Sequence, residues 1–102
     1  MNEIARWTTP SITFKPSMVE IENVDEIYLV VKQNGKECIR KSIEDAIIDE
    51  NGFTWFFTQE DTSVLNERLD AAVKIDYLCG TARYTTNAVP YDITDSAVDE
   101  VI

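Results

Sequence analysis

The chain of 102 residues carries 19 acidic and 9 basic side chains, so its net charge at neutral pH is −10. A chain of this length forms one domain with a single core. Its excess of carboxylates repels phosphate groups, which argues against nucleic acid and against anionic membranes as partners. The longest stretch without a charged residue is nine residues, Asn51 to Gln59, which is too short to span a membrane. Glu3 and Arg6 interrupt the region where a signal peptide needs an apolar core, so we expect synthesis in the cytoplasm.

The residue types needed for catalysis are scarce. The chain has no histidine, which removes the commonest general base and the commonest zinc ligand. Its three glycines, at positions 35, 52 and 80, complete none of the glycine-rich motifs that cradle phosphate or carry a serine nucleophile. We therefore expect no catalytic residue, no cofactor and no metal, and we predict that the protein is not an enzyme.

For the cysteines and for one acidic turn, a chemical role competes with a structural one. Cys38 and Cys79 could form a disulfide, lie free in the core or belong to an oligomer contact. Free, buried thiols are favoured, because the chain is apolar enough to fold without a disulfide. Arg83 lies near Cys79 in sequence and could activate it as a nucleophile, but packing is the favoured role. Asp49 to Gly52 resembles a fragment of a calcium loop, although a hairpin turn explains it with fewer ligands.

The first half of the chain predicts strands joined by tight turns. Residues 1–5 are expected to be loose, and Ser11 to Lys15 alternates as a strand that flanking prolines place at a sheet edge. Glu26 to Gln33 is the strongest strand, with isoleucine, leucine and valine on one face and Tyr28 and Val30 on the other. Asn34-Gly35 predicts a type I′ hairpin turn into a strand over residues 36–42.

The most apolar strand is predicted in the middle of the chain. Residues 43–48 form either a short strand or an irregular edge, and residues 49–52 form a turn. In the strand that follows, Phe53, Trp55 and Phe57 share one face and are expected to fill the core. Phe56 then points outward.

The second half begins with the single helix signal. Thr58 and Asp61 form a capping box that predicts a short helix over Gln59 to Leu65. A strand over residues 71–78, a turn at 79–81 and a strand over 82–89 follow. Pro90 is expected to weaken that strand, which resumes to residue 93.

Short segments and frequent turns are typical of a β-sandwich. The predicted fold is all-β: an antiparallel sandwich of about seven strands with one short helix. We divide the chain into an N-terminal arm (1–9), a sandwich domain (10–94) and an acidic C-terminal tail (95–102). Outward aromatic side chains are the candidate interface, namely Phe56, Tyr28, Tyr84 and Tyr91. A helix or loop that covers Phe56 is the competing explanation.

Several segments resemble small proteins encoded in phages and prophages of Gram-positive gut bacteria. The start, RWTTPSITF, is similar to their R-G-T-T-P-T-x-T-F, with Trp7 in place of glycine. IYLVVKQNGK, FTWFFTQEDT, AAVKIDYL and VDEVI resemble later segments of these proteins in the same order, so the resemblance covers nearly the whole chain. It implies an immunoglobulin-like sandwich, similar to baseplate and tail accessory modules, and gives no catalytic residues.

Three functions are consistent with these observations. The favoured one is a non-enzymatic virion or tail-associated component that is made in the bacterial cytoplasm and binds a protein, either itself or another tail protein. The second is a module that binds carbohydrate or a host surface through Phe56, Tyr84 and Tyr91. The third is a small enzyme whose site forms between subunits. Oligomeric state is left open by the sequence.

Overall fold

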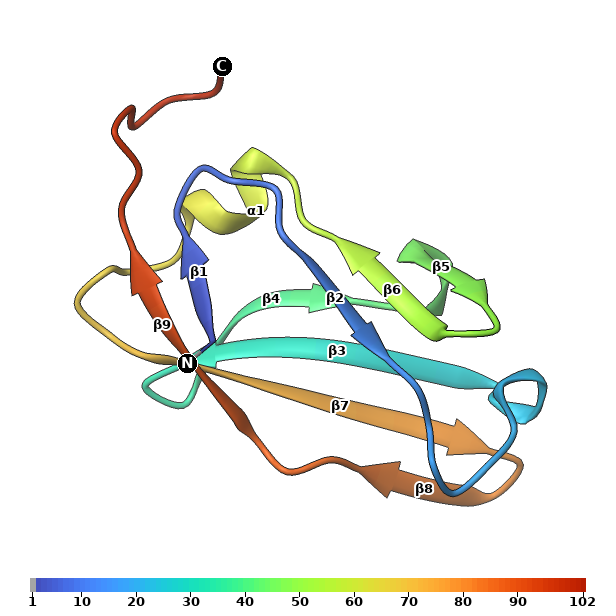
Figure 1. The fold of residues 1–102 in the computed structure, drawn as a ribbon. Helices are drawn as coiled ribbons and strands as arrows, with labels where there is room; N and C mark the ends of the chain where they lie inside the picture. The colour runs from blue at the N-terminus through green and yellow to red at the C-terminus, as the bar shows by residue number, and fades with distance from the viewer. Residues whose placement is uncertain (1) are drawn as a thin grey trace.

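Two packed β-sheets make up the described part of the chain. The computed structural model describes residues 2–102 and has a β-sandwich-like, all-β architecture (Figure 1). The strands are β1 Glu3–Ala5, β2 Ser11–Phe14, β3 Glu26–Gln33, β4 Lys36–Lys41, β5 Ala46–Asp49, β6 Gly52–Phe56, β7 Ala71–Cys79, β8 Ala82–Thr85 and β9 Val89–Thr94. The helical segments are the 3-10 turns η1 Ile21–Asn23 and η2 Ile43–Asp45 and the α-helix α1 Gln59–Ser63.

The larger sheet has the strand order β1-β9-β7-β3-β4, with β8 also paired to β7. Its central pair is β3 and β7, which are antiparallel from Glu26 opposite Leu78 to Gln33 opposite Ala71. The β3–β4 hairpin closes through Asn34 and Gly35, whose φ angles are 52° and 77°. Both central residues therefore have the positive φ that a type I′ turn requires, and the predicted hairpin is confirmed.

The smaller sheet has the order β2-β6-β5. Strand β2 pairs only with β6, so its predicted place at a sheet edge is confirmed. The undecided segment 43–48 resolves into η2 followed by β5, which is the other edge of this sheet. The turn at residues 49–52 joins β5 to β6 as predicted, with Asp49 opposite Gly52.

The core forms where the inward faces of the two sheets meet. Ile27, Leu29 and Val31 of β3 are fully buried, as the alternation of that strand predicted. Trp55 and Phe53 of β6 are also fully buried and supply much of the aromatic bulk. The indole N–H of Trp55 donates to the backbone carbonyl of Ser42 at 2.9 Å, so burial leaves this donor satisfied.

The N-terminal segment corrects one expectation. Residues 1–5 were expected to be loose, but Glu3–Ala5 form strand β1, and Met1 lies outside the described residues. Strand β1 runs parallel to β9, with Ile4 opposite Ile93, so one pair of the expected antiparallel sheet is parallel. Ile4 is only 2% exposed, and its burial together with this pairing orders the segment.

Residues 2–102 contain nine strands, where about seven were expected. Besides β1, the additional strand arises because the predicted strand over 82–89 breaks after Thr85. There the Thr86 hydroxyl oxygen accepts the backbone N–H of Ile75, at 3.0 Å, which interrupts the ladder. Pro90 lies within β9, so proline is not what ends the strand.

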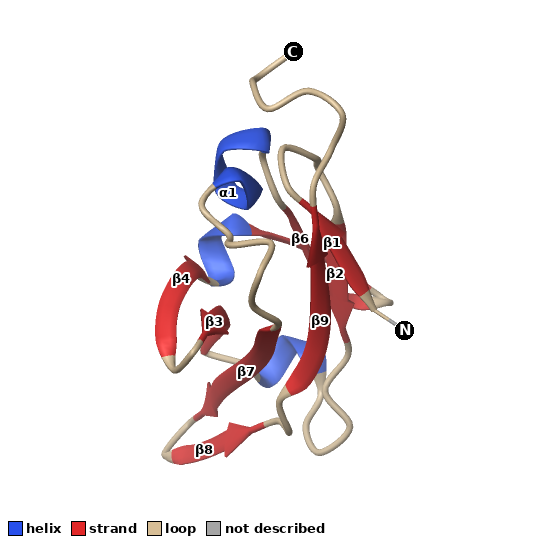
Figure 2. Cartoon of the chain, turned by 90° about the vertical axis from the view of Figure 1, so that its left-hand side faces the viewer, coloured by secondary structure: helices blue, strands red, loops and turns tan. Residues whose placement is uncertain are grey.

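Helix α1 covers one end of the sandwich (Figure 2). Its capping box is present: the Asp61 N–H donates to the Thr58 hydroxyl, and the Thr58 N–H donates to the Asp61 carboxylate. The helix ends at Ser63, slightly earlier than predicted. Residues 95–102 have no regular secondary structure, and the Gln59 side-chain amide exchanges two 2.9 Å hydrogen bonds with the backbone of Ile102.

Candidate functional site

The four aromatic residues proposed as an interface do not form one patch. Phe56 lies on the outer face of the small sheet and is 56% exposed. Tyr28 lies on the outer face of the large sheet, across the core from Phe56. Tyr84 and Tyr91 are half-buried and pack against the edge of the core. The ring of Tyr84 stacks on buried Tyr77, with the two ring centroids 5.0 Å apart.

The first candidate surface is on the small sheet. Ile47 and Ile48 of β5 are 56% and 50% exposed. Ile47 lies opposite Thr54, two residues before Phe56 on β6, so Ile47 and Phe56 are diagonal neighbours on the outer face. We call Ile47, Ile48 and Phe56 the β5 edge patch. Beyond β5 no further strand is paired to this sheet among the residues described.

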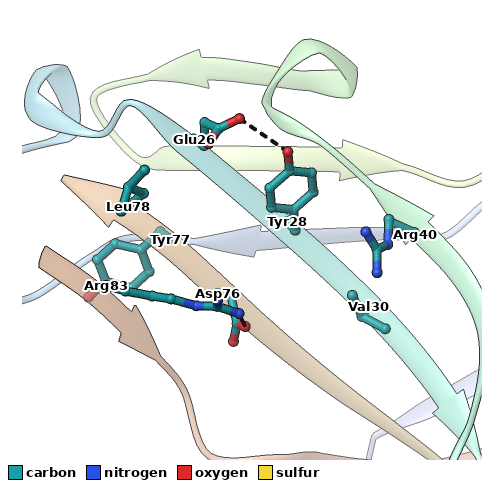
Figure 3. Close-up of a pocket in the computed structure, with 8 residues that line it drawn as sticks. All are labelled: Glu26, Tyr28, Val30, Arg40, Asp76, Tyr77, Leu78 and Arg83. Carbon is teal, nitrogen blue, oxygen red and sulfur yellow. Dashed lines mark hydrogen bonds and ion pairs between the residues drawn. The ribbon is translucent and has the colours of Figure 1, made fainter. Parts of the chain in front are cut away.

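The second candidate surface is the outer face of the large sheet (Figure 3). Strand register places its side chains in rows that cross β4, β3, β7 and β8: Arg40, Val30 and Lys74; Tyr28, Asp76 and Thr85; Glu26, Leu78 and Arg83. Glu37 and Lys32 make up part of a further row. Two adjoining hollows of about 320 and about 560 Å³ lie over these rows and share four lining residues. We call this surface the large-sheet face.

Ion pairs cover part of the large-sheet face. The Arg40 guanidinium lies 2.8 Å from the Glu37 carboxylate and 5.7 Å from the centre of the Tyr28 ring. The Tyr28 hydroxyl donates to the Glu26 carboxylate at 3.2 Å, and this hydrogen bond raises the pKa of Tyr28. The apolar parts of this face are thus shielded by long charged side chains.

A second ion pair crosses from β8 to β7. The Arg83 guanidinium lies 2.8 Å from the Asp76 carboxylate, which also accepts a hydrogen bond from the Thr85 hydroxyl. These hydrogen bonds, that of Thr85 first, hold the pKa of Asp76 below its ordinary value. By contrast, Lys32 and Lys74 form no ion pair within residues 2–102.

The cysteines and the acidic turn at residues 49–52 have structural roles in the fold. Cys38 and Cys79 are free, as predicted, but each is half-buried. The Arg83 guanidinium donates a hydrogen bond to the Asp76 carboxylate, so Arg83 has a structural role that does not involve Cys79. The Asp49 carboxylate accepts the N–H of Asn51 at 2.8 Å, the local hydrogen bond of a turn. Residues 2–102 contain no group of three or more acidic or cysteine side chains placed to hold a metal ion.

The sequence reading missed the two exposed isoleucines of β5. A signal was available: Ile47 and Ile48 are consecutive, and successive side chains of a strand point to opposite faces, so both cannot face one core.

In the part of the chain that the structure describes, no helix has the length and apolar character to cross a membrane.

Comparison of the chain with models of protein families, with curated proteins and with solved structures found no match. The functional evidence therefore lies in the two surfaces described above.

Proposed function

We propose that this protein is a non-enzymatic interaction module that binds a protein partner through the β5 edge patch. The observation that carries the proposal is that both isoleucines of an open edge strand are exposed, Ile47 beside exposed Phe56 on the outer face and Ile48 on the other side of the strand. An open edge offers unpaired backbone N–H and C=O groups to a partner strand, and flanking apolar side chains add buried area.

The edge strand of the large sheet supports this choice. Strand β4 is also an edge strand, but four of its six residues are charged, and its register with β3 shifts between Val31 and Lys32. Charged side chains and irregular register are the usual devices that keep an edge strand from pairing with another chain. Strand β5 has a single charged residue, Asp49, at its end.

The biological setting is part of the same proposal. An immunoglobulin-like module of a phage or prophage, made in the bacterial cytoplasm and associated with the tail or virion, is what the sequence resemblance implies. One structural observation favours that resemblance. Trp7 has a φ of 64°, a left-handed conformation that glycine adopts without strain, and the resembling proteins carry glycine at this point.

A carbohydrate-binding module is the second candidate. Its support is the environment of Phe56, which lies opposite Ser11, with the hydroxyl pair of Thr13 and Thr54 in the next row of the same face. An exposed ring beside hydroxyl groups can stack on a sugar and hydrogen-bond to it. The other aromatics expected in such a site, Tyr84 and Tyr91, lie on the other sheet.

The test uses tail and capsid proteins encoded beside the gene for this chain as probes. We expect one of them to bind the purified protein in calorimetry, and Ile47→Lys and Phe56→Ala to weaken that binding at least about tenfold. Met18→Lys is the matched control, because Met18 is 71% exposed and lies outside the patch. Equal binding by all variants, or no binding by any of these probes, would contradict the proposal. Glycan-array binding that is lost in Phe56→Ala would favour the second candidate.

A further inference from the structure

The charge of the molecule is unevenly distributed. The large-sheet face holds four of the nine basic residues and three of the nineteen acidic ones: Lys32, Arg40, Lys74 and Arg83, and Glu26, Glu37 and Asp76. This face is therefore net +1, and the rest of the chain is net −11. Two copies of such a chain repel each other in any contact that brings their acidic surfaces together. A contact that uses the large-sheet face avoids this repulsion.

The acidic groups of this face are already engaged, whereas two of its cations are not. Glu37 and Asp76 are paired with arginines, and Glu26 accepts the tyrosine hydroxyl. Lys32 and Lys74 are exposed, lie on the neighbouring strands β3 and β7 and have no ionic partner in the described residues. Beside them lie the hollows with a half-buried apolar floor, formed by Tyr28, Val30 and Leu78.

Residues 95–102 have the complementary composition. The segment contains three acidic residues and no basic one, and its apolar side chains are left in solvent: Val98 is 44%, Val101 52% and Ile102 87% exposed. Asp99 and Glu100 form no ion pair in the part of the chain that is described. The segment has no regular structure and projects beyond α1, away from β8 (Figures 1 and 2). Asp95 at its start is paired with Arg6, and Ile102 at its end is hydrogen-bonded to Gln59. The middle of the segment, with Asp99 and Glu100, is therefore the part that is available to another molecule.

We propose that the large-sheet face of one copy binds residues 95–102 of a second copy. Asp99 and Glu100 pair with Lys32 and Lys74, and the valines cover the apolar floor. The contact joins two different surfaces, so in a pair one copy keeps a free segment and the other keeps a free face. Such head-to-tail contacts generate rings or open chains rather than closed dimers. This inference uses a different surface from the β5 edge patch and does not depend on it.

The experiment is sedimentation velocity of the full chain as a function of concentration and salt. At roughly 0.01 M salt the Debye length is about 30 Å, and at roughly 1 M it is about 3 Å. We expect species larger than a dimer at high protein concentration in moderate salt, and their loss at roughly 1 M salt. Lys32→Glu with Lys74→Glu should weaken association at least about tenfold, and Asp99→Lys with Glu100→Lys should do the same.

Mixing the two double variants gives the sharpest outcome. The native segment of the face variant fits the native face of the segment variant, and the reversed face of the first is complementary to the reversed segment of the second. The mixture should therefore associate although neither variant does so alone. Lys15→Glu with Lys36→Glu is the control, because it removes two exposed lysines elsewhere and changes the net charge equally. A parent chain that stays monomeric, a mixture that does not associate, or a control that weakens association as much as the face variant would overturn the proposal. Loss of association in Ile47→Lys alone would also overturn it and assign self-contact to the β5 edge patch.

Discussion

The two sheets of this sandwich contribute to it in opposite ways. The large sheet is held by a long central ladder, β3 with β7, and sends mainly aliphatic side chains inward. The small sheet has three short strands, yet it supplies Trp55 and Phe53, the largest fully buried side chains. The large sheet thus contributes the longest strand pairing, and the small sheet contributes the bulkiest side chains of the core.

Their outer faces differ as well. On the large sheet, ion pairs lie over apolar side chains, as where Arg40 covers Tyr28. On the small sheet, Ile47 and Phe56 are left bare. A sheet whose exterior is covered by its own charges suits selective electrostatic contacts, whereas bare apolar side chains at an open edge suit close packing with a partner. Each face therefore suits a different kind of contact.

The largest expected effect tests the division of β6 into a core face and an outer face. Trp55→Ala should lower the free energy of unfolding by about 4 kcal/mol, because it leaves a large cavity and orphans the Ser42 carbonyl. Phe56→Ala, one residue away, should lower it by less than about 1 kcal/mol. Denaturant titration measures both. Similar losses for the two variants would mean that the small sheet does not have one buried and one free face.

The next effect compares the hairpin turns of the two sheets. A Cβ at Gly52 would lie 2.2 Å from the backbone oxygen of Phe14 in β2, and the φ there is 112°. Gly52→Ala should therefore lower the free energy of unfolding by about 3 kcal/mol. Gly35, at φ 77°, has open space around it, so Gly35→Ala should cost only the conformational strain, about 1 kcal/mol. Equal costs in thermal or chemical unfolding would show that the close approach of β2 to β6 is not rigid.

The smallest effect concerns the ion pair that joins strand β4 of the large sheet to helix α1. Lys41 on β4 lies 2.7 Å from Asp61 in α1, the helix that follows β6. Burial by itself raises the pKa of Asp61, but hydrogen bonds from Lys41 and Thr58 outweigh it and hold the pKa below its ordinary value of 3.8. A carboxyl group whose pKa is lower in the folded than in the unfolded protein stabilises the fold at pH values above its unfolded-state pKa. This contribution is lost as the pH falls through the folded-state pKa.

Asp61→Asn should therefore cost about 1 kcal/mol near neutral pH, and the difference from the parent should shrink below about pH 4. Unfolding measured across pH tests this. Glu37→Gln is the control, because the Arg40–Glu37 pair is more exposed and should contribute nothing measurable. A difference that is constant with pH would mean that Asp61 acts through its capping geometry alone.

Local patterns in the sequence determined the elements whose physics is local. Alternation fixed which side of β3 and β6 is buried, Asn34-Gly35 specified a turn, and Thr58 with Asp61 specified the start of α1. Each of these depends on residues within one strand or one turn, so no distant contact had to be known.

Only the tertiary structure decided how those elements meet. Strand β1 is held by pairing with β9, about ninety residues away, and the sequence of residues 3–5 contains no pattern that identifies this partner. Alternation showed that Tyr28 and Phe56 face outward but could not show that they belong to different sheets, nor that Tyr84 turns onto Tyr77. The physical reason is that periodicity reports the two sides of a strand, whereas the neighbours of each side are set by which strands pair and how the sheets pack.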